Sequence, residues 1–415
     1  MKFLQGSRPS LVVLIYTGIA FFLLVFNPQA LYYGPGSVNG VYIDRVDSFS
    51  EYIVRNTVKD RVLNPDNHSV FPLFTKGFPD DLGYYPQGSH HYYSNLTLQT
   101  LPAVLAAKAL HLNTEAKVDG LLAFLRYANA FLLTLFSCTF LMGFARRHGI
   151  RHHFATPFLV GGSAGFVFYS GNLYFFSALM LMPAAFIAWR AGQRARFPML
   201  AIALVALPYF LRGYEFSTII ALLTALSACL FADGDGRARM RSGIRAFVAV
   251  VLAFVVAVIV QILLIRISVE GVTSLSSALK TAFATLGHRT MSTSGVPKPF
   301  GTDFLLAMRD RWNAVAFSLT PDGIRITELQ VILLVMLAAA VRVRHALLSE
   351  RAIFAYAFVS YASWYIFAYQ HIMWHGMYEW YVFALTVSLS FSLLALVYID
   401  RLVAACVTRF SGPAQ

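Results

Sequence analysis

The sequence predicts an all-α protein that crosses a membrane many times. Hydrophobic residues make up 58% of the 415 residues and charged residues only 13%, whereas a soluble domain carries about 25% charged residues. The mean hydropathy is +0.61, and the apolar residues gather in long uninterrupted runs. A bilayer can cover that much apolar surface, but water-soluble packing cannot.

About ten apolar runs predict the membrane-spanning helices. They lie near 11–27, 122–145, 154–170, 173–189, 197–212, 216–232, 246–267, 327–342, 352–369 and 381–399. Several are slightly shorter than the roughly 20 residues that cross a bilayer upright. The first run follows Lys2 and Arg8, and the sequence before Ala30 lacks the small residue that signal cleavage needs. We therefore expect an uncleaved signal-anchor span.

The basic residues predict the orientation of these spans. They occupy alternate short connections, at Lys2, Arg8, Arg146, Arg147, Arg151, Arg190, Arg194, Arg196, Arg237, Arg239, Arg241, Arg245, Arg342, Arg344, Arg351, Arg401 and Arg409. The short opposite loops together hold only Arg212. Because basic loops stay in the cytoplasm, both termini are expected there. This placement also explains the net charge of +13 without a nucleic-acid partner.

Two long segments then fall outside the cytoplasm, 28–120 and 268–326, within one membrane-embedded domain covering 1–415. Inside them, 96–112, 275–287 and 304–312 are apolar or amphipathic and predict short interfacial helices. If 96–112 crossed the bilayer, the basic connection at 146–153 would lie outside. The cysteines, Cys138, Cys229 and Cys406, lie in or beside apolar runs, so no disulfide framework is predicted.

The first long segment carries the clearest candidate for catalysis. Asp44 and Asp47 follow the first span closely and are three residues apart, so on a helix they would share one face. Partial desolvation near a membrane boundary raises the proton affinity of a carboxylate and suits it to act as a general base. The alternative is a solvated acidic cluster paired with Arg45.

Further polar residues at the predicted outer boundary suit binding of an anionic group. They are Lys76, Arg212, Tyr214, Glu215, Arg266, His371 and His375. Arg212 and Glu215 are close enough in sequence to pair with each other instead. His371 and His375 are four residues apart, but no third ligand follows. No metal site is therefore predicted, and the alternatives are hydrogen bonds to a phosphate or packing in an aromatic belt.

Several stretches resemble a known family. Residues 168–174 (FYSGNLY), 213–216 (GYEF) and the region from Trp364 to Trp380, together with the acidic segment after span one, are similar to the GT-C class of integral-membrane glycosyltransferases. The resemblance implies a GT-C-like bundle with a polyprenyl-phosphate sugar as donor and a glycan, lipid or protein as acceptor. It also implies a site on the periplasmic side of a bacterial inner membrane.

By position, the resemblance gives the role of base to Asp44 or Asp47. The corresponding acidic residue in this class activates the acceptor or binds a metal, so a divalent cation is compatible and no other cofactor is implied. The adjacent Asp-Glu and His-Pro-Asp-Glu signatures of some subfamilies are missing from this chain, which leaves the choice between the two aspartates open.

Two other functions remain open from the sequence. An O-antigen polymerase or ligase would carry Arg and His in a late loop, as His288, Arg289, Arg309 and Arg311 do here, but the larger and earlier loop favours the GT-C interpretation. A flippase or transporter predicts inverted repeats and charges within spans. The sequence shows no convincing repeat, and Arg126 is the main charge within a predicted span.

Overall fold

The chain is an integral membrane protein of the all-α class. The computed structural model describes residues 9–26, 41–64, 71, 73–74, 90–91, 100–192, 198–290, 302–318, 325–342, 347–367 and 378–410. Three stretches within these residues, Glu115–Arg147, Gly236–Ser268 and Tyr378–Thr408, are long and apolar enough to cross a membrane. Together with shorter apolar helices they confirm the predicted polytopic class.

Each predicted span coincides with one or more helices. They are α2 (Pro9–Val25), α6 (Glu115–Arg147), α7 (Thr156–Gly161), α8 (Ala164–Tyr169), α9 (Ala178–Gly192), α10 (Met199–Phe210), α11 (Ser217–Phe231), α12 (Gly236–Ser268), α15 (Glu328–Arg342), α16 (Leu348–Phe367), α18 (Tyr378–Phe383), η4 (Ala384–Ser388) and α19 (Leu389–Phe410). Helices α18 and α19 are continuous through η4, which is a π-helical stretch.

The third predicted span, near 154–170, differs from a single helix. It consists of α7 and α8, separated at Ser163, whose backbone is extended. There the chain pairs with β3 (Val315–Phe317), and the Ser318 amide donates to the Gly162 carbonyl over 3.0 Å. Non-helical backbone is tolerated at membrane depth only when the protein covers it. The second long segment therefore returns into the bundle.

The two long segments contain helices at the three predicted interfacial positions, α5 (Leu101–Ala109), α13 (Leu275–Thr290) and α14 (Thr302–Trp312). They also contain α4 (Val41–Leu63), which was not predicted as an interfacial helix. Short antiparallel pairs join β1 (Leu73–Phe74) to β2 (His90–His91) and β3 to β4 (Ile326–Thr327).

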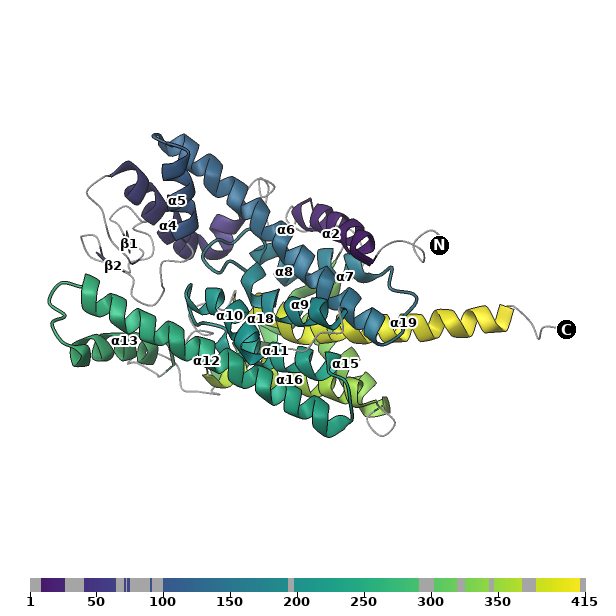
Figure 1. Cartoon of the computed structure of the whole chain (residues 1–415). Coiled ribbons are helices and arrows are strands. Elements are labelled where there is room, and N and C mark those ends of the chain that lie inside the picture. Colours follow the sequence, from purple (N-terminus) through teal and green to yellow (C-terminus); the bar gives the residue numbers. More distant parts are fainter. Residues whose placement is uncertain are drawn as a thin grey trace.

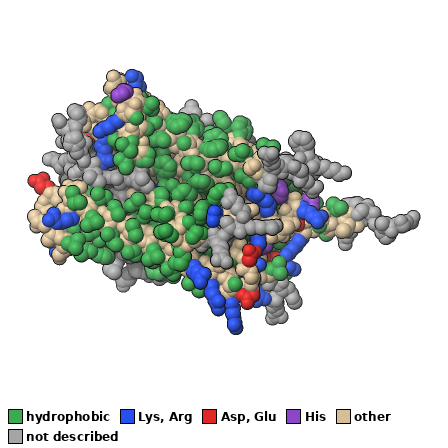
Figure 2. All heavy atoms as spheres, viewed as in Figure 1, with side chains coloured by type: hydrophobic (Ala, Val, Ile, Leu, Met, Phe, Trp, Pro, Cys, Tyr) green, Lys and Arg blue, Asp and Glu red, His purple; other side chains and the backbone are tan. Residues whose placement is uncertain are grey.

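Both long segments contribute to the same end of the bundle. Helices α4, α5 and α13 lie there, opposite the end where α2 begins and α19 ends (Figure 1). Phe71 of the first segment packs against Ile262 and Ile265 of α12 and against Ala278 and Ala282 of α13. Hydrophobic side chains cover the middle of the face in Figure 2, and lysine and arginine gather toward its two ends.

The opposite end is fastened by polar contacts between connections and helices. One carboxylate oxygen of Asp400 in α19 accepts hydrogen bonds from the backbone amides of Arg151 and His152, both at 2.9 Å. It also contacts the His152 ring nitrogen Nδ1 at 2.8 Å. Tyr16 of α2 contacts His153 at 3.1 Å, so this end of the bundle is closed by side chains from two helices and one connection.

His148, at the end of α6, makes the stability of the fold depend on pH. Its ring lies 4.4 Å from the Phe144 ring, and burial, aided by Arg239 and Arg147, lowers its pKa to about 4. An unfolded chain has a histidine pKa of about 6.5. The neutral ring therefore contributes stability above pH 6.5 that is lost as the pH falls toward 4.

We expect His148→Gln to reduce the loss of stability between pH 7.5 and pH 5 by on the order of 1 kcal/mol, allowing for partial solvent screening. The measurement is the thermal unfolding temperature of the purified protein in detergent at both pH values. Replacing the exposed His111 by asparagine is the control and should leave the pH dependence unchanged. An identical loss in wild type and His148→Gln would contradict the assignment.

Candidate functional site

The site is built on the buried connection between α8 and α9, residues 170–177, which we call the 170–177 turn. Asn129 of α6 donates to the Ser170 carbonyl over 2.7 Å and to the Ser177 hydroxyl over 3.0 Å. Its side-chain oxygen accepts from the Ala178 amide over 3.1 Å, and the Tyr381 hydroxyl donates to the Ser177 carbonyl over 2.8 Å. These bonds satisfy backbone groups that the bilayer cannot and hold the turn in one conformation.

Glu51 of α4 binds this turn from one side. One of its carboxylate oxygens accepts from the amides of Leu173 and Tyr174, at 2.6 and 3.0 Å. The other accepts from Arg126 of α6 at 3.1 Å, and the Glu51 side chain is only 1% exposed. Burial raises the pKa of the Glu51 carboxyl, while Arg126 and the two amides favour its charged form. The carboxylate thereby joins α4, α6 and the turn.

Arg212 binds the turn from another side. Its guanidinium donates to the Tyr174 carbonyl over 3.0 Å, to the Tyr209 hydroxyl over 2.8 Å and to Glu215 over 2.7 Å. The side chains of Arg212 and Glu215 are 0% and 1% exposed. The guanidinium also lies 4.6 Å from the centre of the Tyr209 ring, where a cation is attracted by the aromatic face. The ion pair between Arg212 and Glu215, which their spacing in the sequence allows, is therefore present, and both side chains are buried.

A pair of carboxyl groups lies where α15 and α18 begin. Glu328 and Glu379 are both buried, and their carboxyl groups lie close to each other. The hydroxyls of Tyr361 and Tyr365 both donate to one oxygen of Glu379, that of Tyr365 over 3.1 Å. Among the residues that the structure describes, neither side-chain oxygen of Glu328 has a hydrogen-bond partner.

Aromatic rings join these polar groups into one centre. Phe175 of the turn lies 4.8 Å from Tyr378 and 5.3 Å from Phe216, and Phe216 lies 4.9 Å from Trp364. The Tyr378 hydroxyl is 3.1 Å from that of Ser50. Ser50 is next to Glu51 in sequence, and Tyr378 is next to Glu379. This contact therefore links the region around Glu51 to the pair formed by Glu328 and Glu379. The structure brings together the three stretches that carry the family resemblance.

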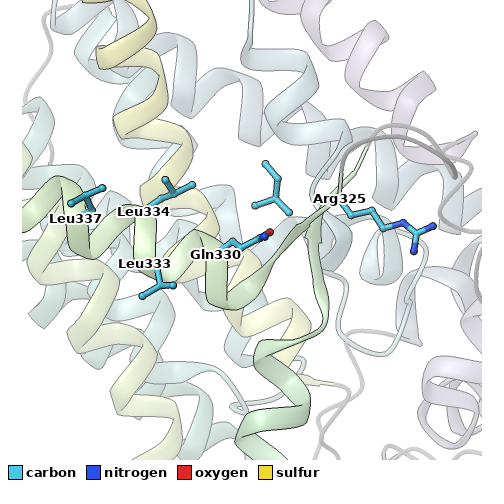
Figure 3. A pocket seen from close by; sticks show the side chains of 6 residues that line it. Arg325, Gln330, Leu333, Leu334 and Leu337 are labelled. Atoms are coloured by element: carbon cyan, nitrogen blue, oxygen red, sulfur yellow. The ribbon is translucent and has the colours of Figure 1, made fainter.

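A groove runs along one face of α15. It has a volume of about 470 Å³ and is lined by Leu333, Leu334 and Leu337 along the helix, with Arg325, Ile326 and Gln330 at its start. Figure 3 shows the three leucines along the helix and Arg325 beyond its first turn. Arg325 precedes the buried Glu328 by three residues, and the short strand β4 lies between them.

The predicted site residues are placed unevenly. Asp44 and Asp47 lie in the first turns of α4, with side chains outside the described part of the chain, and Lys76, His371 and His375 lie outside the described residues altogether. Arg212, Tyr214 and Glu215 lie in the connection between α10 and α11 beside the 170–177 turn. Arg266 is exposed at the end of α12 and donates to the Val272 carbonyl over 3.3 Å.

The sequence-based prediction of the site did not include Glu51, Glu328 and Glu379. Glu51 had a signal, because Arg126 is a charge within a predicted span and such a charge needs a buried partner. Glu328 and Glu379 had none, since their pairing depends on how α15 packs beside α18. Among the described residues, no three His, Cys, Asp or Glu side chains converge as metal ligands would.

Comparisons with known proteins give one similar structure. No protein-family model and no curated protein matches the chain. Among solved structures, the chain is similar to the crystal structure of the Archaeoglobus fulgidus oligosaccharyltransferase in the apo form, with 13% sequence identity and a TM-score of 0.47. The alignment covers 100% of this chain and 53% of that one, so this chain spans about half the length of that structure.

Proposed function

We propose that this protein is a GT-C-type, inverting glycosyltransferase. It moves a sugar from a polyprenyl-phosphate donor to a glycan, lipid or protein acceptor on the periplasmic side of a bacterial inner membrane. The observation that carries the proposal is the attachment of α4, whose first turns hold Asp44 and Asp47, to a buried polar and aromatic centre inside a membrane bundle.

The chemistry assigns each group a role. The acceptor hydroxyl oxygen attacks the anomeric carbon while Asp44 or Asp47 takes its proton. The bond from that carbon to the phosphate oxygen breaks, and polyprenyl phosphate leaves with the electron pair. Positive or donating groups stabilise the departing charge, and the candidates are Lys76, Arg212, Tyr214, Arg266, His371 and His375, with Glu215 holding Arg212.

The groove on α15 supports a lipid-linked donor. Its wall of three leucines suits an isoprenoid tail, and Arg325 at its start suits a phosphate at the boundary. A soluble nucleotide sugar has no apolar tail to fill such a groove.

The test is sugar transfer by Asp44→Asn and Asp47→Asn in membranes supplied with polyprenyl phosphate carrying radiolabelled glucose, mannose or arabinose. One of the two substitutions is expected to lower the rate by about 10²- to 10⁴-fold, the contribution of a positioned base. Asp60→Asn on the same helix is the control and should transfer normally. Full transfer by both variants would refute the assignment of the base.

Two further outcomes would contradict the proposal as a whole. One is movement of the labelled lipid across vesicle membranes without transfer of its sugar, which would make the protein a flippase. The other is a cytosolic location of a reporter fused near residue 60. Comparison of surface glycans by mass spectrometry, with and without the protein, identifies the sugar and the acceptor.

A further inference from the structure

Helix α4 is joined to α6 by ion pairs of two kinds. Near its middle, Arg55 and Lys59 reach Asp119, at 2.9 and 3.0 Å, from partly exposed positions. One turn earlier, Glu51 reaches Arg126 from a buried position. Only Glu51 also binds backbone amides, those of Leu173 and Tyr174.

The two kinds of contact constrain the helix differently. A lysine or arginine side chain can follow a moving partner, because its long stem has several rotatable bonds. Two successive backbone amides of a turn that is itself held by Asn129 and Tyr381 cannot follow. Glu51 therefore fixes both the depth of α4 in the bundle and its rotation about its own axis.

The helix register links this contact to the proposed base. Asp47 and Asp44 precede Glu51 by four and seven residues in the same helix, which is about one and two turns. Positions with this spacing share one face of a helix. A change in the rotation or depth of α4 at Glu51 is therefore transmitted to both aspartate positions.

We propose that Glu51 is a positioning residue, which clamps α4 to the 170–177 turn and to Arg126 and so sets the place of Asp44 and Asp47 for the transfer step. The role rests on the proposed glycosyltransferase function. Both carboxylate oxygens of Glu51 are occupied by the two turn amides and by Arg126, so in this role it contacts neither donor nor acceptor. Ser50, whose hydroxyl meets that of Tyr378, adds a second contact at the same level.

The test compares Glu51→Gln with Asp119→Asn in the purified full-length protein. Both substitutions remove a charge that joins α4 to α6, but only the first weakens the contact with the turn, because a neutral amide oxygen is a poorer acceptor than a carboxylate for the Leu173 and Tyr174 amides. Hydrogen exchange of the peptide covering 170–177 is expected to accelerate at least about tenfold in Glu51→Gln and to stay at the wild-type rate in Asp119→Asn. This readout is independent of any activity.

Kinetics with the polyprenyl-phosphate sugar that wild type uses give the second readout. Displacement of a reacting group by about 1 Å costs about 100-fold, so Glu51→Gln should lower kcat by about that factor with KM within about twofold. The pH at which the rate falls on the acidic side should stay the same, because the base is still present. Asp119→Asn should keep the wild-type kcat.

The outcomes separate the clamp from the proposed function. Unchanged exchange at 170–177 in Glu51→Gln overturns the clamp, and accelerated exchange with a wild-type kcat overturns the positioning role. Absence of transfer by wild type with every donor refutes the proposed function and the positioning role together. Hydrogen exchange at 170–177 still tests whether Glu51 holds the turn. If Glu51→Gln does not fold, Glu51→Asp keeps the charge beside Arg126 but is too short to hold both amides. It is expected to show the same two changes, and wild-type behaviour overturns the proposal.

Discussion

Replacing Arg212 by glutamine is expected to destabilise the protein by about 3–5 kcal/mol, enough to remove most of the folded molecules from the membrane. The substitution leaves Glu215, at 1% exposure, as a buried charge without its cation. It also removes the donors to the Tyr174 carbonyl and the Tyr209 hydroxyl. A buried carboxylate that loses its ion-pair partner bears much of its cost of desolvation. The measurement is the yield and thermal unfolding temperature of monomer in detergent.

Two comparisons isolate the buried charge as the cause. Arg55→Gln breaks an ion pair whose side chains are 45% and 35% exposed, and such surface pairs are worth about 0–1 kcal/mol. The double substitution of Arg212 and Glu215 by methionine removes both charges and should be less destabilising than Arg212→Gln alone. A double variant as unstable as the single one would show that lost packing, and not the unpaired carboxylate, is the cause.

The sequence predicts the spans well because each is a local property of the chain. An apolar run long enough for a bilayer can be recognised without knowing its neighbours, and every predicted run coincides with helices in the structure. The break at Ser163 could not be predicted in this way. It depends on pairing with Phe317, which lies in another long segment, so only the tertiary fold shows that the run near 154–170 is two helices.

In the candidate site, too, the local contacts could be predicted from the sequence and the contacts between distant segments could not. The pairing of Arg212 with Glu215 follows from a spacing of three residues, and the sequence already offered it as an alternative to phosphate binding. The contacts of Glu51 with Arg126, Leu173 and Tyr174 cross three separate segments. Residue types alone pointed to Asp44 and Asp47 in that region but not to the neighbour that holds their helix, because burial and not spacing distinguishes Glu51.

The second substitution with a large expected effect is at Gly165, where α8 and α18 are in close contact. A Cβ atom at Gly165 would lie 2.1 Å from the Trp380 carbonyl oxygen and 2.7 Å from the Ala384 Cβ. The first of these atoms belongs to a helix backbone and cannot turn aside as a flexible side chain would. We expect Gly165→Ala to destabilise the protein by about 3 kcal/mol, at the upper end of the cost of overpacking. The thermal unfolding temperature in detergent measures it.

The matched control is Gly120→Ala in α6, where a Cβ atom would meet nothing within 4 Å. Alanine there should stabilise the helix by about 0.5–1 kcal/mol, so the two substitutions are expected to shift the unfolding temperature in opposite directions. Folded Gly165→Ala should also lose activity, because moving α18 displaces Tyr378 and Glu379 from the centre around the 170–177 turn. Equal unfolding temperatures for the two variants would mean that α8 and α18 are not held in this contact.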